Sequence, residues 1–464
     1  MNFHLTVLLS YASILMGLGV WLGRRVKSSD GFFVAGRRLS PLLLFSTMLA
    51  ANIGAGSTVG AAGLGYRDGL SAWWWVGSAG FGSIMLAFWI GPRLRKLSEV
   101  HAFRTLGDFL EHRYGQSVRI TIGILLWFGT LAILAGQLIA IAWVLNVITG
   151  LEHWMGCVVG GIVVTVYFSS GGLLTTVWIN LVQLVLLFIG FIVVFPLSLI
   201  AVDGWTPVVT TTQHIKGYWN VWQGGGSGWF YLAMLGPAFV VSPGLLQKVY
   251  GARDDRTVRI GVGLNAAALL VFAAIPPLLG MMARAAFPDL PDYDLALPTL
   301  LMDSLPPLVG ALGLAALFSA EVSSSDAILF MLSTSLSQDL YRRFARPTAS
   351  DTDVLSVARW AAIGSGVLGT ILAILSESIT GALSFFYTLL TVSLFVPVIG
   401  GLYLRRFSST EALASIAGGI GLTVLVQLNR GGQGLAGFTP AMCGLIGAGL
   451  AWFIASRFKT QPVS

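Results

Sequence analysis

Residues 49–60 of the chain read LAANIGAGSTVG, and they interrupt an apolar run, residues 39–66, that is long enough to cross a lipid bilayer. Three glycines and two hydroxyl residues fall near the middle of this run. A helix broken at this depth exposes N–H and C=O groups. Each such group costs several kcal/mol in hydrocarbon unless it has a hydrogen-bond partner. The stretch therefore predicts a break that lines a cavity or holds a polar ligand, or else a glycine-rich helix packed closely against its neighbours.

The composition of the whole chain is that of a polytopic membrane protein. It is 464 residues long, 55% hydrophobic and 10% charged, whereas soluble domains carry about 25% charged residues. No polar stretch is long enough to house a soluble catalytic domain. Thirteen apolar runs are candidate spans: residues 3–23, 39–66, 70–90, 120–147, 154–168, 173–200, 229–250, 260–283, 308–336, 360–375, 382–404, 412–428 and 438–454.

The distribution of basic residues predicts the orientation. If residues 3–23 run from outside to inside and the later spans alternate, only Arg67, Lys216, Arg284 and Arg430 of the 27 basic residues lie outside. This bias predicts a multi-pass protein of the plasma (inner) membrane, with its N-terminus outside and its C-terminus cytoplasmic. The net charge of +7 then reflects topology, and we expect no nucleic-acid partner. On the cytoplasmic side, Thr105 followed by acidic residues predicts a short amphipathic helix.

Two groups of five spans open with an interrupted helix. The second span is broken by its glycines, and the seventh contains Gly236-Pro237 and Pro243-Gly244. The alternating topology makes the two groups inverted relative to each other. Paired breaks of this kind indicate a binding site at the membrane midplane of a secondary transporter. We expect one transporter domain, residues 1–464, divided into an extra helix (3–23), two repeats (39–201 and 229–404) and two C-terminal helices (409–457).

The ninth span is unusually polar. Ala320, Ser323 and Ser324 are spaced so that they share one helix face. Together with main-chain carbonyls released by the broken second span, their oxygens would form a neutral cage that suits a hard monovalent cation. The alternative is that the serines bond to carbonyls of their own helix or join neighbouring helices.

Glu321 and Asp326 are acidic residues in the same span. Because burying a charge there is expensive, an ionisable group in the membrane predicts a function. Glu321 could be a protonatable partner of the cation site, a neutral acid bonded to Asn180, or a structural acid bonded to a nearby carbonyl. We interpret Asp326 as polarity for a gate or for helix packing.

Several motifs in order along the chain resemble the sodium:solute symporter family. The matching residues are Asp30-Gly31-Phe32-Phe33-Val34-Ala35-Gly36-Arg37; Ala50-Ala51-Asn52-Ile53 with Gly60, Gly63 and Tyr66; Gly171-Gly172-Leu173 with Trp178 and Gln183; Pro243 with Gln247-Lys248; and Ser323-Ser324-Ser325-Asp326 with Gln338-Asp339-Leu340-Tyr341. The resemblance implies an all-α membrane protein of about 13 helices. Its fold would be the five-plus-five inverted-repeat transporter fold with one extra N-terminal and two extra C-terminal helices.

The resemblance also implies a sodium site. The family's principal site would use the carbonyls of Ala50, Ile53 and Ala320 and the hydroxyls of Ser323 and Ser324. Several members carry an aspartate where this chain has Asn180. We therefore expect one sodium ion in each cycle.

The solute pocket is expected between the broken spans. By facing and by family position we expect it to involve Asn52, Ser57, Thr58, Trp74, Gln137, Phe239, and Phe386 or Tyr387. No Lys or Arg lies deep in a span to pair with a carboxylate. This absence favours a small organic solute that is neutral, zwitterionic or a monocarboxylate.

These patterns together predict a sodium-coupled symporter that works by alternating access, and no enzymatic activity. A proton-coupled symporter using Glu321 is one alternative. Another is a transporter-like solute sensor that signals to a separate partner. Apart from the solute and the lipid bilayer, the sequence indicates no obligate partner.

Overall fold

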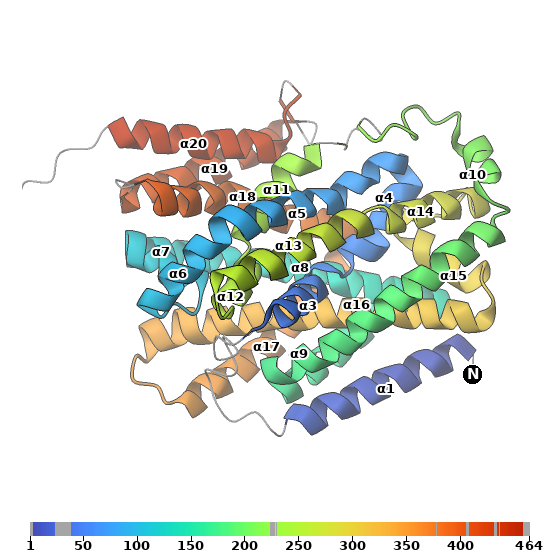
Figure 1. Cartoon of the computed structure of the whole chain (residues 1–464), viewed down its shortest axis with the longest axis horizontal. Coiled ribbons are helices and arrows are strands. Elements are labelled where there is room, and N and C mark those ends of the chain that lie inside the picture. Colours follow the sequence, from blue (N-terminus) through green and yellow to red (C-terminus); the bar gives the residue numbers. More distant parts are fainter. Residues whose placement is uncertain are drawn as a thin grey trace, which may run out of the picture.

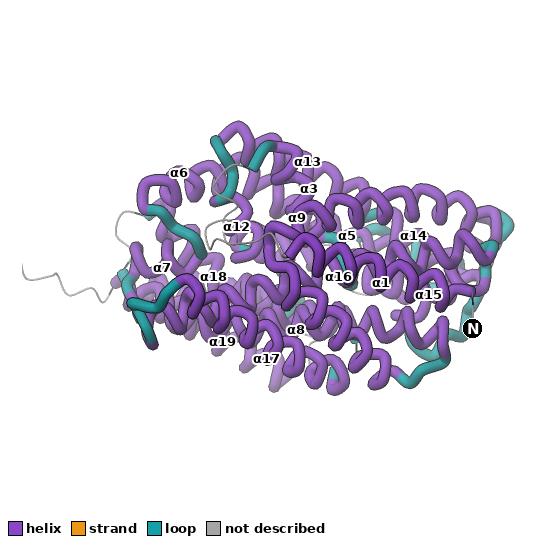
Figure 2. Tube along the Cα trace, turned by 90° about the horizontal axis from the view of Figure 1, so that it is seen from below, coloured by secondary structure: helices purple, strands orange, loops and turns teal. Residues whose placement is uncertain are grey.

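The computed structural model describes residues 3–23, 39–222, 228, 230–376, 378–404, 408–430, 434–435 and 437–457. This part of the chain is almost entirely helical, with two isolated β-bridges and no strand (Figures 1 and 2). The predicted loop motif at residues 30–37 lies outside the described residues, as do the side chains of Asn180, Gln338 and Asp339.

The helices of the first half are α1 (Phe3–Gly23), α3 (Pro41–Asn52), η2 (Gly56–Gly60), α4 (Ala61–Asp68), η3 (Gly69–Ala72), α5 (Trp73–Met85), η4 (Leu86–Ile90), α6 (Gly91–His101), α7 (Leu106–Tyr114), α8 (Gln116–Thr149), α9 (His153–Ala201) and α10 (Trp205–Thr212). Those of the second half are α11 (Phe230–Val241), α12 (Pro243–Tyr250), α13 (Asp255–Phe272), α14 (Ile275–Ala286), η6 (Tyr293–Leu295), α15 (Ala296–Asp303), α16 (Pro307–Thr334), η7 (Ser335–Ala345), α17 (Asp351–Leu375), α18 (Ile379–Tyr403), α19 (Ser409–Arg430) and α20 (Pro440–Arg457).

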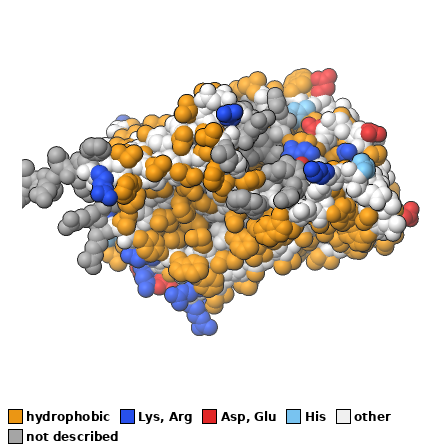
Figure 3. Space-filling model, turned by 90° about the horizontal axis from the view of Figure 1, so that it is seen from above, with side chains coloured by type: hydrophobic (Ala, Val, Ile, Leu, Met, Phe, Trp, Pro, Cys, Tyr) orange, Lys and Arg blue, Asp and Glu red, His pale blue; other side chains and the backbone are white. Residues whose placement is uncertain are grey.

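Most of the long helices run along the long axis of the molecule (Figure 1). Among the described residues, ten helices are long and apolar enough to cross a membrane, and three shorter ones are apolar. Hydrophobic side chains cover much of the flank between the two ends (Figure 3). Trp89, Ile192, Trp360 and Leu428 are each more than half exposed. A surface of this kind is stable only where lipid covers it.

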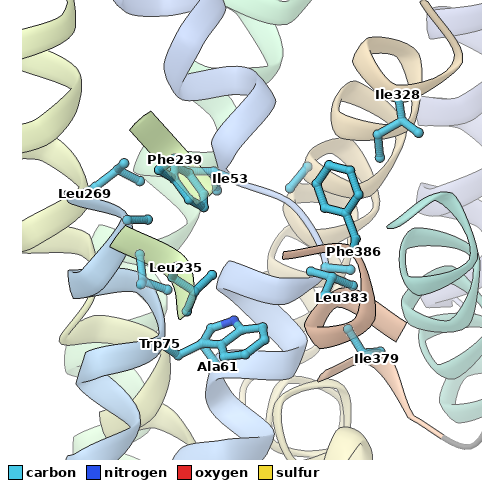
Figure 4. Packing of buried hydrophobic residues seen from close by; sticks show 14 of the residues in the cluster. Ile53, Ala61, Trp75, Leu235, Phe239, Leu269, Ile328, Ile379, Leu383 and Phe386 are labelled. Atoms are coloured by element: carbon cyan, nitrogen blue, oxygen red, sulfur yellow. The ribbon is translucent and has the colours of Figure 1, made fainter. Parts of the chain in front are cut away.

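The first interruption lies where the sequence predicts it. Ser40 caps the start of helix α3 by accepting a hydrogen bond from the Leu43 N–H, and Pro41 occupies the first turn. It ends at Asn52 because Ile53 takes an extended conformation, with φ −100° and ψ 101°. The chain then re-enters a helix through η2 and continues into α4. Figure 4 shows this non-helical connection beside Ile53.

The second interruption lies between α11 and α12. Ser242 has ψ 119° and leaves the helical region, as expected for a residue before a proline. Pro237 lies within α11 instead of ending it. Of the two Gly/Pro pairs in this span, only the second therefore coincides with an end of a helix.

Two predicted spans form one helix in the structure. The runs at 154–168 and 173–200 both belong to α9, which continues from His153 to Ala201. The predicted amphipathic helix is α7, where Thr105 and Asp108 form a reciprocal capping box.

A loop between α14 and α16 lies against α4, the part of the broken helix that follows the interruption. Its η6 turn carries Asp294, whose side chain is fully buried and accepts a hydrogen bond from the Ile379 N–H at 3.1 Å, at the start of α18. A Cβ atom at Gly63 of α4 would come within 3.0 Å of the other Asp294 oxygen. One loop carboxyl group therefore lies between α4 and α18.

The electrostatic surroundings of Asp294 do not favour its charge. Burial raises the pKa of this carboxyl group to about 7, with nearby Asp292 also raising it, while the Ile379 N–H and Arg67 lower it less. Between the ordinary value of 3.8 and about 7, the folded protein therefore binds more protons at this site than the unfolded chain does.

We predict that Asp294 makes the protein less stable as the pH rises through this window, by up to about 1.4 kcal/mol per pH unit. Asp294→Asn keeps an acceptor for the Ile379 N–H but cannot titrate. Its unfolding midpoint in detergent should fall less between pH 5 and 7.5 than that of the wild type. Asp289→Asn, at an exposed position of the same loop, should behave as the wild type. Equal pH slopes for all three proteins would contradict the prediction.

Candidate ion and solute site

Side chains bond the backbone groups that the break between α3 and α4 exposes. The Gly54 N–H donates to Ser57 Oγ at 2.9 Å, and the Ala55 N–H donates to Gln137 Oε1 of α8 at 2.9 Å. The indole N–H of Trp75 donates to the Gly56 carbonyl at 2.8 Å. The interruption is thus held by hydrogen bonds from its own residues, α5 and α8, as buried polar groups require.

Helix α16 faces the carbonyls at the end of α3. Ser324 Oγ donates to the Ile53 carbonyl at 2.9 Å and lies 3.4 Å from the Ala50 carbonyl oxygen. Ser323 Oγ is buried and has no hydrogen-bond partner among the described residues. Ala320 is buried one turn before Ser324. These are the five residues that the family resemblance implies for sodium.

The oxygens of this group are all neutral. Within the described part of the chain, no cluster of three or more His, Cys, Asp or Glu could hold a metal ion. A cation here would be held by carbonyl and hydroxyl oxygens, which suit hard ions. The unpartnered hydroxyl of Ser323 is a further oxygen that such an ion could use. The residues therefore fit a monovalent cation such as sodium.

Glu321 lies one residue from Ala320 and is completely buried. Thr58 Oγ1, which follows the break in η2, lies 2.8 Å from Glu321 Oε1 and 2.9 Å from the Gly54 carbonyl. Glu321 Oε2 has no partner among the described residues. The acid thus connects α16 directly to the broken helix through Thr58. Asp326 is also fully buried in α16.

A small cavity lies beside the break. It measures about 30 Å³, which is room for a water molecule or two. Five predicted pocket residues line it: Asn52, Ser57, Gln137, Phe239 and Tyr387. No Asp, Glu, Lys or Arg is among the lining side chains.

Three other predicted pocket residues lie elsewhere. Thr58 is turned toward Glu321. Trp74 packs against Trp222, with ring centroids 4.9 Å apart. Phe386 does not line the cavity, and its ring packs beside that of Tyr387 at 5.3 Å.

The neighbouring residue Trp75 lines the cavity instead of Trp74. Its ring lies 5.0 Å from Tyr231 and 6.2 Å from Tyr387, and Tyr387 lies 5.5 Å from Phe239. Figure 4 shows Trp75, Leu235 and Phe239 across the cavity from Leu383. The sequence has three consecutive tryptophans, residues 73–75, and gives no signal for which of them faces the cavity.

The chain is similar along most of its length to known membrane transporters. The model of the sodium:solute symporter family matches residues 32–419. The sodium/pantothenate symporter of Escherichia coli (strain K12) is 27% identical over 484 residues, covering 98% of this chain and 96% of that protein. The high-affinity proline transporter PutP of Bacillus subtilis (strain 168) is 24% identical over 432 residues, covering 89% and 90%.

A solved structure has the same fold. It is a substrate-bound, outward-open Na+-coupled sialic acid symporter with a TM-score of 0.81 and 19% sequence identity, covering 99% of this chain and 98% of that one. The fold class predicted from the sequence, an all-α inverted-repeat transporter, is confirmed by this likeness.

Gly54 offers a test of how closely α16 approaches the break. A Cβ atom there would overlap Ser324 Oγ and lie 2.5 Å from Gln137 Oε1. We predict that Gly54→Ala lowers stability by about 1–3 kcal/mol, because α16 and α8 must move apart. Gly421→Ala, whose Cβ would meet nothing within 4 Å, should change stability by less than about 0.5 kcal/mol. Thermal unfolding in detergent measures both, and equal midpoints would contradict the prediction.

Proposed function

The chain belongs to the sodium:solute symporter family, as its motifs indicated, and we propose that it moves a small organic solute across the membrane together with sodium. Transport would proceed by alternating access around the break between α3 and α4. The cavity beside the break would widen to admit the solute from one side and would close before opening to the other. The protein acts as a carrier in this proposal and catalyses no covalent step.

The observation that carries the proposal is the hydrogen bond from Ser324 to the Ile53 carbonyl. It joins α16 to the end of α3 at the place where the released carbonyls converge. Sodium would bind between the carbonyls of Ala50, Ile53 and Ala320 and the hydroxyls of Ser323 and Ser324. Its positive charge would attract both helices and stabilise their contact. Without sodium, the described residues join α16 to the end of α3 here through the neutral hydrogen bonds of Ser324.

One sodium ion in each cycle is the stoichiometry we propose. The support is the identity of residue 180, which is asparagine. An amide has no negative charge with which to attract a second cation. Sodium binding and solute binding would both favour the arrangement in which α3 and α16 are in contact. Each ligand would then raise the affinity for the other by the same factor.

The lining of the cavity limits the solute class. Its polar groups are amides, hydroxyls and backbone groups, and its remaining walls are aromatic or aliphatic. With no cationic side chain in the lining, a multiply charged anion would lose its hydration without compensation. We therefore propose a neutral, zwitterionic or monocarboxylate solute. The named solutes of the two curated relatives, pantothenate and proline, belong to these classes.

We further propose that the protein lies in the plasma (inner) membrane with its N-terminus outside. The start of α1 lies at the end of the molecule opposite to α6 and α7 (Figure 1). Basic side chains of Arg93, Arg95 and Lys96 lie on α6. The positive-inside rule assigns this end to the cytoplasm.

A proton-coupled symporter is the second candidate, and the contact between Thr58 and Glu321 favours it. Protonation of Glu321 would change the hydrogen bond that joins α16 to the outer half of the broken helix. A proton could then perform the part that sodium performs in the first proposal.

The sodium proposal predicts ion-specific stabilisation that needs no known solute. An ion that binds only the folded protein stabilises it by about 2.7 kcal/mol at one hundred times Kd. The unfolding midpoint in detergent should therefore rise in sodium chloride relative to potassium chloride at the same ionic strength. Ser323→Ala/Ser324→Ala should remove this difference.

The matched control for that experiment is Ser325→Ala/Ser333→Ala. Both residues are buried serines of α16 whose hydroxyls bond to carbonyls of their own helix. This control should keep the sodium effect. Equal midpoints in sodium and potassium for the wild type would reject the proposal, as would a sodium effect that survives in Ser323→Ala/Ser324→Ala.

Glu321→Gln separates the two coupling ions. The amide can still bond to Thr58 but cannot take up or release a proton. If sodium is the coupling ion, Glu321→Gln should keep the sodium-specific stabilisation. This stabilisation should vary with pH between 5.5 and 8 as it does in the wild type. Two results together would establish the proton alternative. The stability of the wild type would depend on pH and not on sodium, and this pH dependence would be lost in Glu321→Gln but kept in Asp326→Asn.

A further inference from the structure

The first two turns of α18 pack closely against the part of the broken helix that follows the interruption. Leu383 of α18 lines the cavity, and a Cβ atom at Gly56 of η2 would overlap its side chain. One turn earlier in α18, Ile379 and Thr380 would each lie 3.3 Å from a Cβ atom at Gly60. Helix α4 continues from η2 toward the end of the molecule at which α1 begins (Figure 1). This contact, which we call the α4–α18 interface, therefore lies between the cavity and that end.

The turn η6 fills the α4–α18 interface with two neighbouring side chains. Asp294 Oδ2 accepts a hydrogen bond from the Ile379 N–H at 3.1 Å, and the hydroxyl groups of Tyr293 and Thr380 lie 3.4 Å apart. On the side of α4, a Cβ atom at Gly63 would lie 2.8 Å from the Tyr293 ring and 3.0 Å from Asp294 Oδ1. One turn of a loop thus holds the start of α18 and the middle of α4 together.

The surroundings of Asp294 suit a neutral carboxyl group better than a charged one. The side chain is fully buried, and Oδ1 has no hydrogen-bond partner among the described residues. A carboxylate in this position would lose its hydration and gain only the Ile379 N–H in return. A protonated carboxyl group avoids this cost and still offers Oδ2 to the same N–H.

The charged residues nearest to Asp294 do not balance it. Arg67 of α4 donates to both carboxyl oxygens of Asp68, at 2.9 and 2.7 Å, and its guanidinium group lies 5.0 Å from the centre of the Tyr293 ring. Asp292 lies in the same loop as Asp294 and adds negative charge. The cation that acts on Asp294 from α4 is therefore already engaged by another carboxylate.

The other elements packed against η6 add no cation close to Asp294 in the part of the chain that the structure describes. Helix α8 carries one charged residue, Arg119, near its opposite end, and α15 carries only Asp303, its last residue. Neither η2 nor α18 contains a charged residue. His153, at the start of α9, interacts with Asp292. Protonation of Asp294 is thus the simplest way to keep this interface closed.

We propose that Asp294 is a proton-dependent latch, which holds α4 against α18 while its carboxyl group is neutral and releases them when it ionises. The inference rests on the proposed function, because the α4–α18 interface would have to open for a solute to enter from the end that we propose to face outside. Opening would let water hydrate the carboxylate. An acidic exterior would therefore keep the cavity closed on this side.

The two protonation states give the direction and the size of the effect. In the closed interface, burial raises the pKa of Asp294 to about 7, and nearby Asp292 adds to this rise, while the Ile379 N–H and Arg67 lower the pKa less. In an open interface the hydrated carboxyl group would return toward its ordinary value of 3.8. Closure then takes up a proton between these two values. Each pH unit in this window should shift the ratio of open to closed molecules toward the open form by up to about tenfold.

The test measures how fast a thiol introduced at position 380 reacts with an uncharged maleimide. Full-length purified protein with the substitution Thr380→Cys is labelled in detergent and potassium chloride, without sodium or solute. Thr380 is 7% exposed, so the thiol should react mainly when the α4–α18 interface opens. Cys157 and Cys443 are both buried, and the wild-type protein gives their background rate.

Each rate is divided by the rate of Thr380→Cys/Asp294→Asn at the same pH. The division cancels the ordinary increase of thiol reactivity with pH, and the amide keeps an acceptor for the Ile379 N–H but cannot ionise. We expect the ratio of the two rates to rise by roughly tenfold or more between pH 5 and pH 7.5. A charge on Asp294 would by itself slow the nearby thiol by disfavouring the thiolate, so this direct effect cannot produce the rise.

The matched control is Thr380→Cys/Asp289→Asn, which changes an exposed acid of the same loop. It should react as Thr380→Cys does at every pH. If Asp294→Asn does not fold, Asp292→Asn carries the test in the Thr380→Cys background. This amide keeps an acceptor for the Asp294 N–H, now 2.8 Å from Asp292 Oδ1, and removes the neighbouring charge. Its labelling, divided by that of the Asp289→Asn control, should level off at a lower pH.

Three outcomes would overturn the proposal. The first is a ratio of rates that stays constant or falls from pH 5 to pH 7.5. The second is an equal loss of the pH effect in Asp289→Asn and in Asp294→Asn. The third, where Asp294→Asn does not fold, is a pH profile that Asp292→Asn leaves unchanged. Because the labelling uses neither sodium nor solute, its failure would reject the latch alone, whereas a missing sodium-specific stabilisation would reject only the proposed coupling.

Discussion

The structure depends on the rule that a backbone polar group in a membrane must have a partner within the protein. The chain leaves its helix after Asn52, and the exposed groups are bonded by Ser57, Gln137 and Trp75. These partners come from the segment itself and from two other helices, α8 and α5. A break that is costly in isolation is therefore stable only in the assembled bundle. The same requirement concentrates hydrogen-bonding side chains around the break, where we propose that sodium and the solute bind.

Two carbonyls at the end of α3 depend on a single hydroxyl, whereas the Asn52 and Gly54 carbonyls accept hydrogen bonds from Ser57 and Thr58. The Ile53 and Ala50 carbonyls face one hydroxyl, Ser324, and the adjacent Ser323 hydroxyl has no partner within the described residues. Each carbonyl has two acceptor positions, and one serine proton can satisfy only one at a time. A cation would meet this surplus of acceptors in a way that another hydroxyl could not. Local imbalance of donors and acceptors would thus be a physical reason for the ion dependence that we propose at this contact.

The sequence predicted the break and the serine face well, because both depend on local spacing. Glycines at 54, 56 and 60 mark the interruption, and residues three and four apart share a helix face whatever the rest of the fold does. The pocket was harder to predict, since it depends on how helices are rotated against each other. A rotation of about 100° per residue decides whether Trp74 or Trp75 faces inward, and three adjacent tryptophans leave that open. The partner of Glu321 is similarly a long-range contact, and the structure gives Thr58.

In the proposed transport cycle, the arrangement of charge would let the bundle bind a sodium ion and still release it. The cavity and the α3–α16 contact contain only neutral oxygens and aromatic rings, so a monovalent ion meets no fixed countercharge except the nearby acid Glu321. Binding to neutral oxygens is weak enough to be reversed when the helices separate. A paired carboxylate at the same place would hold the ion more tightly and slow its release. Strong ion pairs occur where rigidity is useful, as between Glu111 and the arginines at the end of the bundle. The ion pairs of Glu111 thus lie apart from the neutral contact between Ser324 and the end of α3.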